Sequence, residues 1–185
     1  MKNRLTKIIA VSAAFTLVTS ITQANAAHAY SLYLNGCAWS TGTLRIDERD
    51  VQPHAAYLNS LHAAVYDYNH NTANLALSNV YVTGPALVAT FANDASANWE
   101  AITYRYCPFG LGITSATFKL NVAHLPSSTA ALQLKVVWEH ELGHSLGLDH
   151  VPQNTHVMYG YASAAYLNGV TGLTQDEING INFLY

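Results

Sequence analysis

Hydrophobic and polar residues alternate with a period of two in several short stretches of the chain. The clearest stretch is residues 115–125, where Ala116, Phe118, Leu120 and Val122 alternate with mostly polar neighbours. This alternation predicts a strand with one buried face. Further β-rich runs predict strands over residues 43–46, 79–84, 86–94 and 99–107.

A second period, of three to four residues, predicts three helices. Pro53 suits the first turn of the first helix, and Ser127 or Ser128 suits the N-terminal cap of the second. Thr174 and Glu177 have the spacing of a capping box at the start of the third. The apolar stripes are Leu58, Leu61, Val65 and Tyr68 in residues 53–71, and Ile178, Ile181 and Tyr185 in residues 173–185; the second helix is expected over residues 127–144.

The order of these elements indicates the fold class. It runs strand, helix, several strands, helix, irregular segment and helix. This order predicts an α+β fold with a mixed sheet rather than a regularly alternating one. A chain of 185 residues, half of them hydrophobic, is long enough for one domain with a real core.

The N-terminus has the three-part pattern of a secretory signal peptide. Lys2, Arg4 and Lys7 precede a short apolar run over residues 8–18, about half the ~20 residues that span a bilayer. We expect residues 1–26 to be cleaved after Ala26, with a second possible site after Ala29. Residues 27–185 would then form one secreted, extracellular domain without a membrane anchor.

Charge narrows the classes of partner. Removing residues 1–26 leaves five Lys and Arg against eleven Asp and Glu, a net charge of −6. This charge disfavours nucleic acids and anionic membrane surfaces as partners. We expect a monomer.

The candidate chemistry lies in "HELGHSLGLDH". His140 and His144 are four residues apart on a predicted helix, so both imidazoles lie on one face. Gly147 can leave the helix in a left-handed conformation, which lets His150 approach the same point. Three neutral imidazoles with water in a fourth position suit one catalytic Zn²⁺. Glu141 is rotated ~100° from His140 around the helix, so it is predicted to activate the zinc-bound water rather than to bind the metal.

This stretch resembles the zinc signature of the metzincin metallopeptidases, and most closely that of the matrixin branch. "NTHVMYG", residues 154–160, resembles the Met-turn of these enzymes, with Met158 eight residues after His150. The closing segment "LTQDEINGINFLY" resembles the last helix of small bacterial members. The resemblance implies a metzincin-like α+β fold with a twisted mixed sheet, two long helices, a Met-turn and a C-terminal helix. It also implies a secreted zinc endopeptidase whose protein or peptide substrate lies along an edge strand, within residues 99–106 or 116–122.

The sequence departs from the animal members of the branch in several features. We find neither a cysteine-switch motif nor room for a propeptide after the signal. Residues 84–115 lack histidine and hold Asp94 and Glu100 as the only acidic pair. We therefore predict no second zinc, and Ca²⁺ stays open. Gly160 stands where some metzincins have a zinc-binding tyrosine, so Tyr159 and Tyr161 are predicted to pack or to form a pocket wall.

The two cysteines have two interpretations. In an exported protein, Cys37 and Cys107 most simply form one disulfide. The alternative is a Cys37 thiolate that covers the metal and keeps an enzyme latent.

Two other functions remain as alternatives to a zinc endopeptidase. A zinc-binding or adhesion module without catalysis would not need Glu141. A zinc hydrolase of cell-wall peptides would have the same catalytic core. Five other histidines lack ligand partners at useful spacing; they are His54, His62, His70, His124 and His156.

Overall fold

The computed structural model describes residues 30–81 and 87–185. The predicted signal peptide and both of its expected cleavage sites lie outside these residues. Within the described ranges, no helix combines the length and the apolarity that a bilayer crossing requires.

A five-stranded mixed sheet forms the framework, in the order β3-β2-β4-β6-β5. β5 is antiparallel to β6, and the other neighbouring strands are parallel. The bounds are β2 Thr43–Asp47, β3 Ala76–Val80, β4 Leu87–Ala92, β5 Ala101–Tyr106 and β6 Ser115–Asn121. β5 therefore lies at an edge and β6 in the interior, so only the first of the two expected substrate strands is an edge strand.

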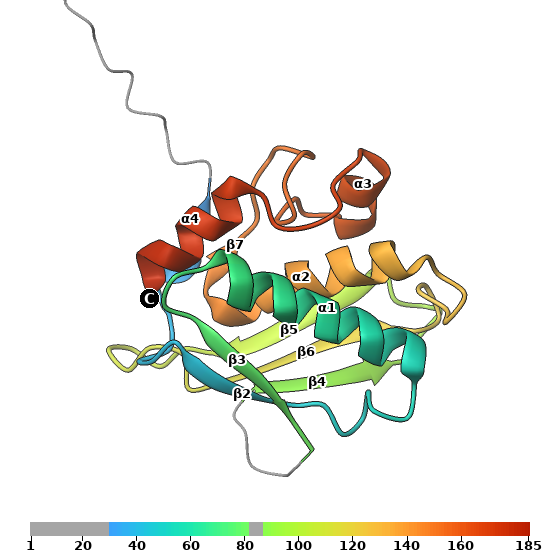
Figure 1. The fold of residues 1–185 in the computed structure, drawn as a ribbon, viewed down its shortest axis with the longest axis horizontal. Coiled ribbons are helices and arrows are strands. Elements are labelled where there is room, and N and C mark those ends of the chain that lie inside the picture. Colours follow the sequence, from blue (N-terminus) through green and yellow to red (C-terminus); the bar gives the residue numbers. More distant parts are fainter. Residues whose placement is uncertain (1–29, 82–86) are drawn as a thin grey trace, which may run out of the picture.

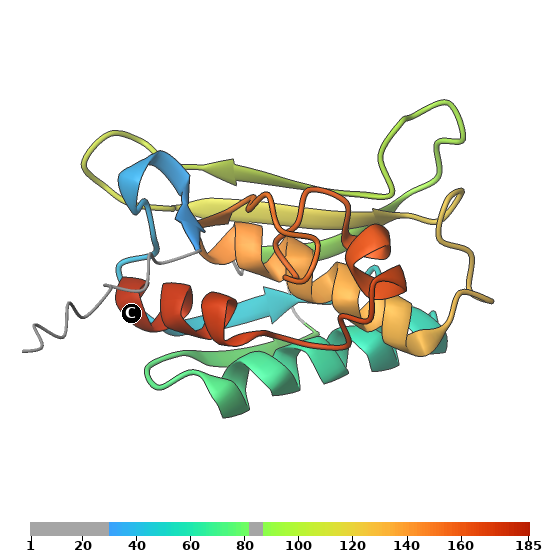
Figure 2. The same cartoon turned by 90° about the horizontal axis from the view of Figure 1, so that it is seen from above.

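Two long helices cover one face of the sheet. α1 (Ala55–Asn71) and α2 (Ala131–Leu146) lie side by side there, as Figure 1 and Figure 2 show. α1 buries residues at helical spacing, and Trp138 of α2 packs edge-on against Phe118 of β6. The predicted α+β class with two long helices is confirmed.

The C-terminal part consists of α3 (Ala162–Leu167) and α4 (Gln175–Leu184). The capping box of Thr174 and Glu177 is present at the start of α4, as predicted. The predicted cap of α2 is wrong. This helix follows Ala130 without a side-chain cap, because Ser127 and Ser128 lie inside a turn that the Thr129 amide closes on the Pro126 carbonyl at 2.8 Å.

Sequence patterns also placed β3 too late and missed one short α-helix and two short strands. β3 begins at Ala76, not at residue 79, because Leu77 is its inward apolar residue and Asn69 of α1 bonds both backbone groups of Leu77. The missed elements are α3 and the two-residue strands β1 (Ser31–Leu32) and β7 (Leu148–Asp149), which pair with each other. Strands this short carry no readable period.

Cys37 and Cys107 form the predicted disulfide. It ties the N-terminal segment to the end of β5 across a separation of 70 residues. The N-terminal segment and α4 meet at the C-terminal end of α2 (Figure 1 and Figure 2).

We expect the disulfide to stabilise the fold mainly by restricting the unfolded chain. Replacing Cys37 and Cys107 together by alanine should lower the free energy of unfolding by about 2–4 kcal/mol, because the bond closes a long loop. Urea denaturation of oxidised wild type, reduced wild type and the double variant measures this. Equal stability of oxidised and reduced wild type would contradict the expectation.

Candidate functional site

The C-terminal half of α2 and the turn after it bring three histidines together. His140 and His144 are one helical turn apart, and α2 ends at Gly147 with φ of 114°. A Cβ atom at Gly147 would lie 2.6 Å from the Cys37 carbonyl oxygen, so only glycine fits this turn. The predicted left-handed exit at Gly147 is therefore confirmed, and it returns the chain so that His150 faces the other two rings.

The three rings point their Nε2 atoms at one another. The His150 Nε2 atom lies 3.0 Å from that of His144 and 3.3 Å from that of His140. On the far side of two rings, His140 Nδ1 lies 2.7 Å from the Val157 carbonyl oxygen and His144 Nδ1 lies 3.1 Å from the Leu148 carbonyl oxygen. An Nδ1–H that donates to a carbonyl leaves the Nε2 lone pair free for a metal.

This donor set fits a zinc ion. Burial lowers the pKa of His140 to about 4 and that of His144 well below its ordinary value, and it also lowers the pKa of His150. All three imidazoles are then neutral at pH 7, and their lone pairs would repel one another without a cation between them. Bonds of ~2.0–2.1 Å at tetrahedral angles place ligand nitrogens about 3.3–3.4 Å apart, close to the separations of His150 from the other two.

Glu141 lies beside the histidines and is held by the edge strand. Its side chain is buried, and the Thr103 hydroxyl of β5 lies 2.6 Å from Oε2. Burial raises the pKa of the Glu141 carboxyl to about 8, and the Thr103 hydrogen bond opposes that rise. A cation held by the histidines would favour the ionised form. The carboxyl is therefore suited to accept a proton near neutral pH.

Met158 lies directly beneath α2. A Cβ atom at Gly143 would be 2.4 Å from the Met158 sulfur, so the glycine inside the histidine motif makes room for the methionine. The Met158 amide donates to Glu177 Oε1 at 3.1 Å, and the Val151 amide donates to the Met158 carbonyl at 2.9 Å. The turn around Met158 thus joins the segment after His150 to the start of α4.

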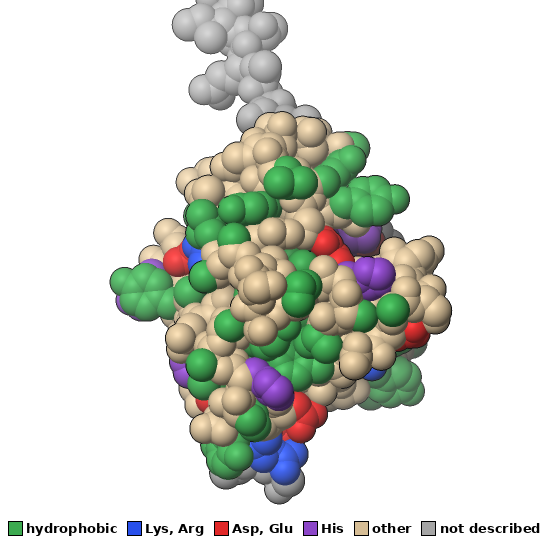
Figure 3. Space-filling model, turned by 90° about the vertical axis from the view of Figure 1, so that its right-hand side faces the viewer, with side chains coloured by type: hydrophobic (Ala, Val, Ile, Leu, Met, Phe, Trp, Pro, Cys, Tyr) green, Lys and Arg blue, Asp and Glu red, His purple; other side chains and the backbone are tan. Residues whose placement is uncertain are grey.

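A cleft of about 780 Å³ runs along β5 to the histidines and Glu141. Its walls include Tyr33, Trp99, Ile102, Tyr161 and Ala162. Tyr161 thus forms a pocket wall, and Tyr159 packs against a small apolar cluster between α2 and α3. Charged side chains are sparse on the face of the molecule that Figure 3 draws, where apolar and uncharged polar groups dominate.

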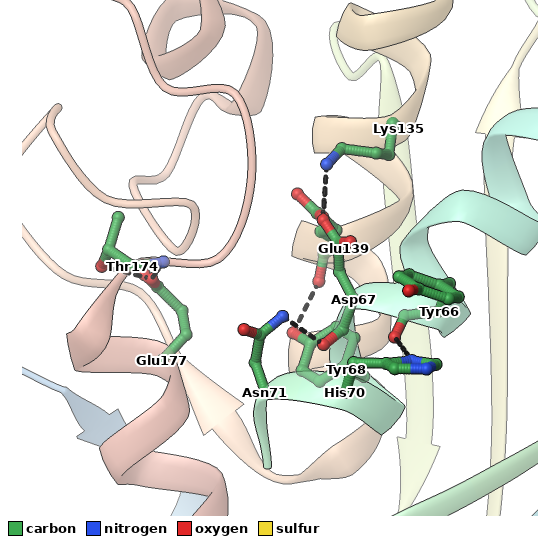
Figure 4. Close-up of polar contacts among 9 residues, drawn as sticks. All are labelled: Tyr66, Asp67, Tyr68, His70, Asn71, Lys135, Glu139, Thr174 and Glu177. Carbon is green, nitrogen blue, oxygen red and sulfur yellow. Dashed lines mark hydrogen bonds and ion pairs between the residues drawn. The ribbon is translucent and has the colours of Figure 1, made fainter.

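A buried carboxyl group lies on the opposite side of α2. Glu139 is fully buried, and Lys135 Nζ lies 3.3 Å from its Oε1 atom and also bonds Asp67 of α1 (Figure 4). Burial raises the pKa of the Glu139 carboxyl to about 9; the Asp67 carboxylate adds to the rise, and Lys135 opposes it. The cluster links α1 to α2 behind the histidines.

We expect Glu139 to make stability depend on pH. Its folded pKa lies above the ordinary value of 4.5, so between about pH 5 and 9 the folded state holds a proton that the unfolded state releases. The free energy of unfolding should therefore fall as the pH rises through this window. Glu139→Gln mimics the protonated carboxyl, so wild type should lose stability relative to this variant by up to ~1.4 kcal/mol per pH unit. Urea unfolding at pH 6, 7.5 and 9 tests this, and parallel curves would refute it.

Four of the other histidines in the described part of the chain have structural partners. His62 pairs with Glu48 at 2.7 Å, His70 stacks on Tyr66, and His124 Nε2 lies 2.8 Å from the Ala97 carbonyl oxygen. His54 packs edge-on against Phe91.

His156 does have potential ligands nearby, which the sequence had not suggested. Its ring lies close to Asp176 and Glu177. However, His156 Nδ1 bonds the Thr174 hydroxyl at 2.9 Å, and both Glu177 oxygens accept hydrogen bonds within the capping box and from the Met158 amide. These groups therefore stabilise the start of α4.

Sequence patterns missed two residues that contact the site, Thr103 and Arg105, and the buried Glu139 behind it. They assigned Glu177 to the capping box alone. Thr103 and Arg105 face inward from β5, in alternation with the exposed Tyr104 and Tyr106, so strand period could have indicated them. Glu139 follows an apolar run, which is the signal of a buried charge. No sequence pattern indicated that the Met158 amide donates a hydrogen bond to Glu177.

Comparison with known proteins agrees with the resemblance to matrixins. The family model described as Matrixin matches residues 41–185. A "Putative matrix metalloproteinase" of Spodoptera frugiperda ascovirus 1a is 47% identical over 47 residues, which are 25% of this chain and 12% of the relative. A protein of the same name from Heliothis virescens ascovirus 3e is 45% identical over 47 residues, again 25% of this chain and 10% of the relative. The matched stretch thus spans about a tenth of the length of these relatives.

Proposed function

Because the chain belongs to the matrixin family, we propose that it is a zinc-dependent endopeptidase, with His140, His144 and His150 as the metal ligands and Glu141 as the catalytic base. Zinc bound there would act as a Lewis acid on water and on the scissile carbonyl. Glu141 takes the proton of the attacking water and gives it to the leaving amine. Thr103 holds Oε2 of this carboxylate, and we assign the proton transfer to Oε1.

The substrate in this proposal is an extended peptide. β5 is an edge strand that borders the cleft, so its backbone can pair with a peptide laid along it. The peptide would then cross the histidines with its scissile bond next to Glu141.

One observation carries the proposal: a buried carboxyl group lies next to three converging imidazoles, beside an edge strand. Metal binding alone requires the imidazoles and not the carboxyl. Incubation of the purified protein with a mixed peptide library, with and without a zinc chelator, tests the function. Cleavage should stop with the chelator and return when zinc is added. Zinc binding without any cleavage would favour the non-catalytic module, and cleavage of cell-wall cross-link peptides alone would favour the other hydrolase.

We also propose that the chain is exported and that residues 1–26 are removed. The three-part N-terminal pattern supports this, and so does the disulfide, since such bonds persist mainly in oxidising compartments. N-terminal sequencing of the protein from the culture medium should begin at Ala27 or, with the second site, at Tyr30. Retention in the cell with an intact N-terminus would refute the proposal.

A further inference from the structure

Five consecutive backbone carbonyls, from His144 to Leu148, each accept a hydrogen bond from a distant part of the chain. They belong to the last turn of α2 and to the turn that leads to His150. The His144 carbonyl accepts from Arg105 Nη1 at 2.6 Å, and the Ser145 carbonyl accepts from Trp39 Nε1 at 2.8 Å. The Leu146 carbonyl accepts from the Tyr185 hydroxyl at 2.7 Å, and the Gly147 carbonyl accepts from the Tyr33 amide at 2.9 Å. The Leu148 carbonyl accepts again from Arg105 Nη1, at 3.0 Å. Carbonyls at a helix end lack partners within the helix, so these donors fix the path of the chain between two of the histidines.

Arg105 has a special position among these donors. A single nitrogen of its guanidinium bonds both the first and the last carbonyl of the series, so it spans the turn. The Leu148 carbonyl that it bonds is the one that faces Nδ1 of His144. The guanidinium itself is held in place, because it lies 3.5 Å from the centre of the Tyr33 ring.

We infer that Arg105 is a positioning residue for the metal centre: it holds the turn between His144 and His150 in the conformation that brings both rings to one metal ion. The inference rests on the proposed function, because it takes the histidines as zinc ligands. Residues that orient metal ligands from outside typically contribute 10–100-fold to metal affinity.

Electrostatics alone makes the opposite prediction. A guanidinium cation close to the histidines repels a metal cation, so removing it should tighten zinc binding if charge were its main effect. The sign of the change in affinity therefore separates positioning from charge. Lysine keeps the charge but lacks the planar guanidinium that lies over the Tyr33 ring, so it separates the two effects further.

The experiment is a titration of the metal-free protein with Zn²⁺ against a chromophoric chelator. Arg105→Met should weaken zinc binding 10–100-fold, and Arg105→Lys should weaken it although the charge is kept. Arg45→Met, at an exposed position on β2, is the matched control and should bind like wild type. The visible spectrum of the Co²⁺-loaded protein should change in both Arg105 variants and not in the control.

The outcomes distinguish the inference about Arg105 from the proposed function. Unchanged or tighter binding by Arg105→Met, with zinc bound by wild type, overturns the inference and leaves the proposed function intact. No zinc binding by wild type overturns the proposed function, and the inference with it. If Arg105→Met does not fold, Tyr33→Leu decides, because it removes the ring beneath the guanidinium and keeps the Tyr33 amide. Weaker zinc binding by that variant supports the inference, and wild-type affinity refutes it.

Discussion

Replacing Glu141 by glutamine should reduce peptide hydrolysis by 10²–10⁴-fold while the zinc content stays the same. Glutamine has nearly the same volume, and its carbonyl oxygen can still accept the Thr103 hydrogen bond, so the packing at the edge strand is kept. What is lost is the group that takes a proton from water and returns it to the leaving amine. The loss should therefore appear in kcat. Steady-state kinetics on a cleavable peptide, at equal zinc content of both proteins, measures it.

Glu139→Gln is the matched control for this experiment. Glu139 is also a buried carboxyl on α2, but it faces Lys135 and Asp67 on the side away from the cleft (Figure 4). We expect wild-type rates at pH 7 from this variant. Equal rates for wild type and Glu141→Gln would mean that hydrolysis arises elsewhere, and the proposed mechanism would be wrong.

The local part of the site could be predicted from sequence because helix geometry is local. A spacing of four residues on a helix puts His140 and His144 on one face, and the structure has them on α2 with their rings in contact. Gly147 ends that helix in the left-handed conformation that its place in the motif predicts. The capping box of Thr174 and Glu177 is local in the same way.

The contacts that hold this site could not be predicted, because they join segments far apart in sequence. Arg105 reaches the end of α2 across 39 residues, and Trp39 reaches it across 106. Strand period can indicate that Arg105 faces inward, but not which carbonyl it meets. The predicted N-terminal cap of α2 was wrong because serine favours turns as well as helix caps. Here both serines lie in the turn before the helix.

Replacing His150 by alanine should abolish stoichiometric zinc binding and, with it, hydrolysis. Loss of a direct ligand should cost more than the 10–100-fold that loss of an orienting residue typically costs. His150 suits this test better than His140 or His144, because it is exposed and those two are buried, so its truncation leaves the core intact. Metal analysis after dialysis measures the content. Thermal unfolding gives a second readout, since a ligand that binds only the folded state raises the melting temperature.

His124→Ala is the control for the loss of a histidine from the cleft. His124 also lines the cleft, but its ring bonds the Ala97 carbonyl and does not face the three converging rings. This variant should keep its zinc and its zinc-dependent rise in melting temperature, whereas His150→Ala should melt at the same temperature with and without added zinc. Full zinc occupancy in His150→Ala would rule out the three-histidine site, because the two rings left on α2 would then suffice to hold the ion.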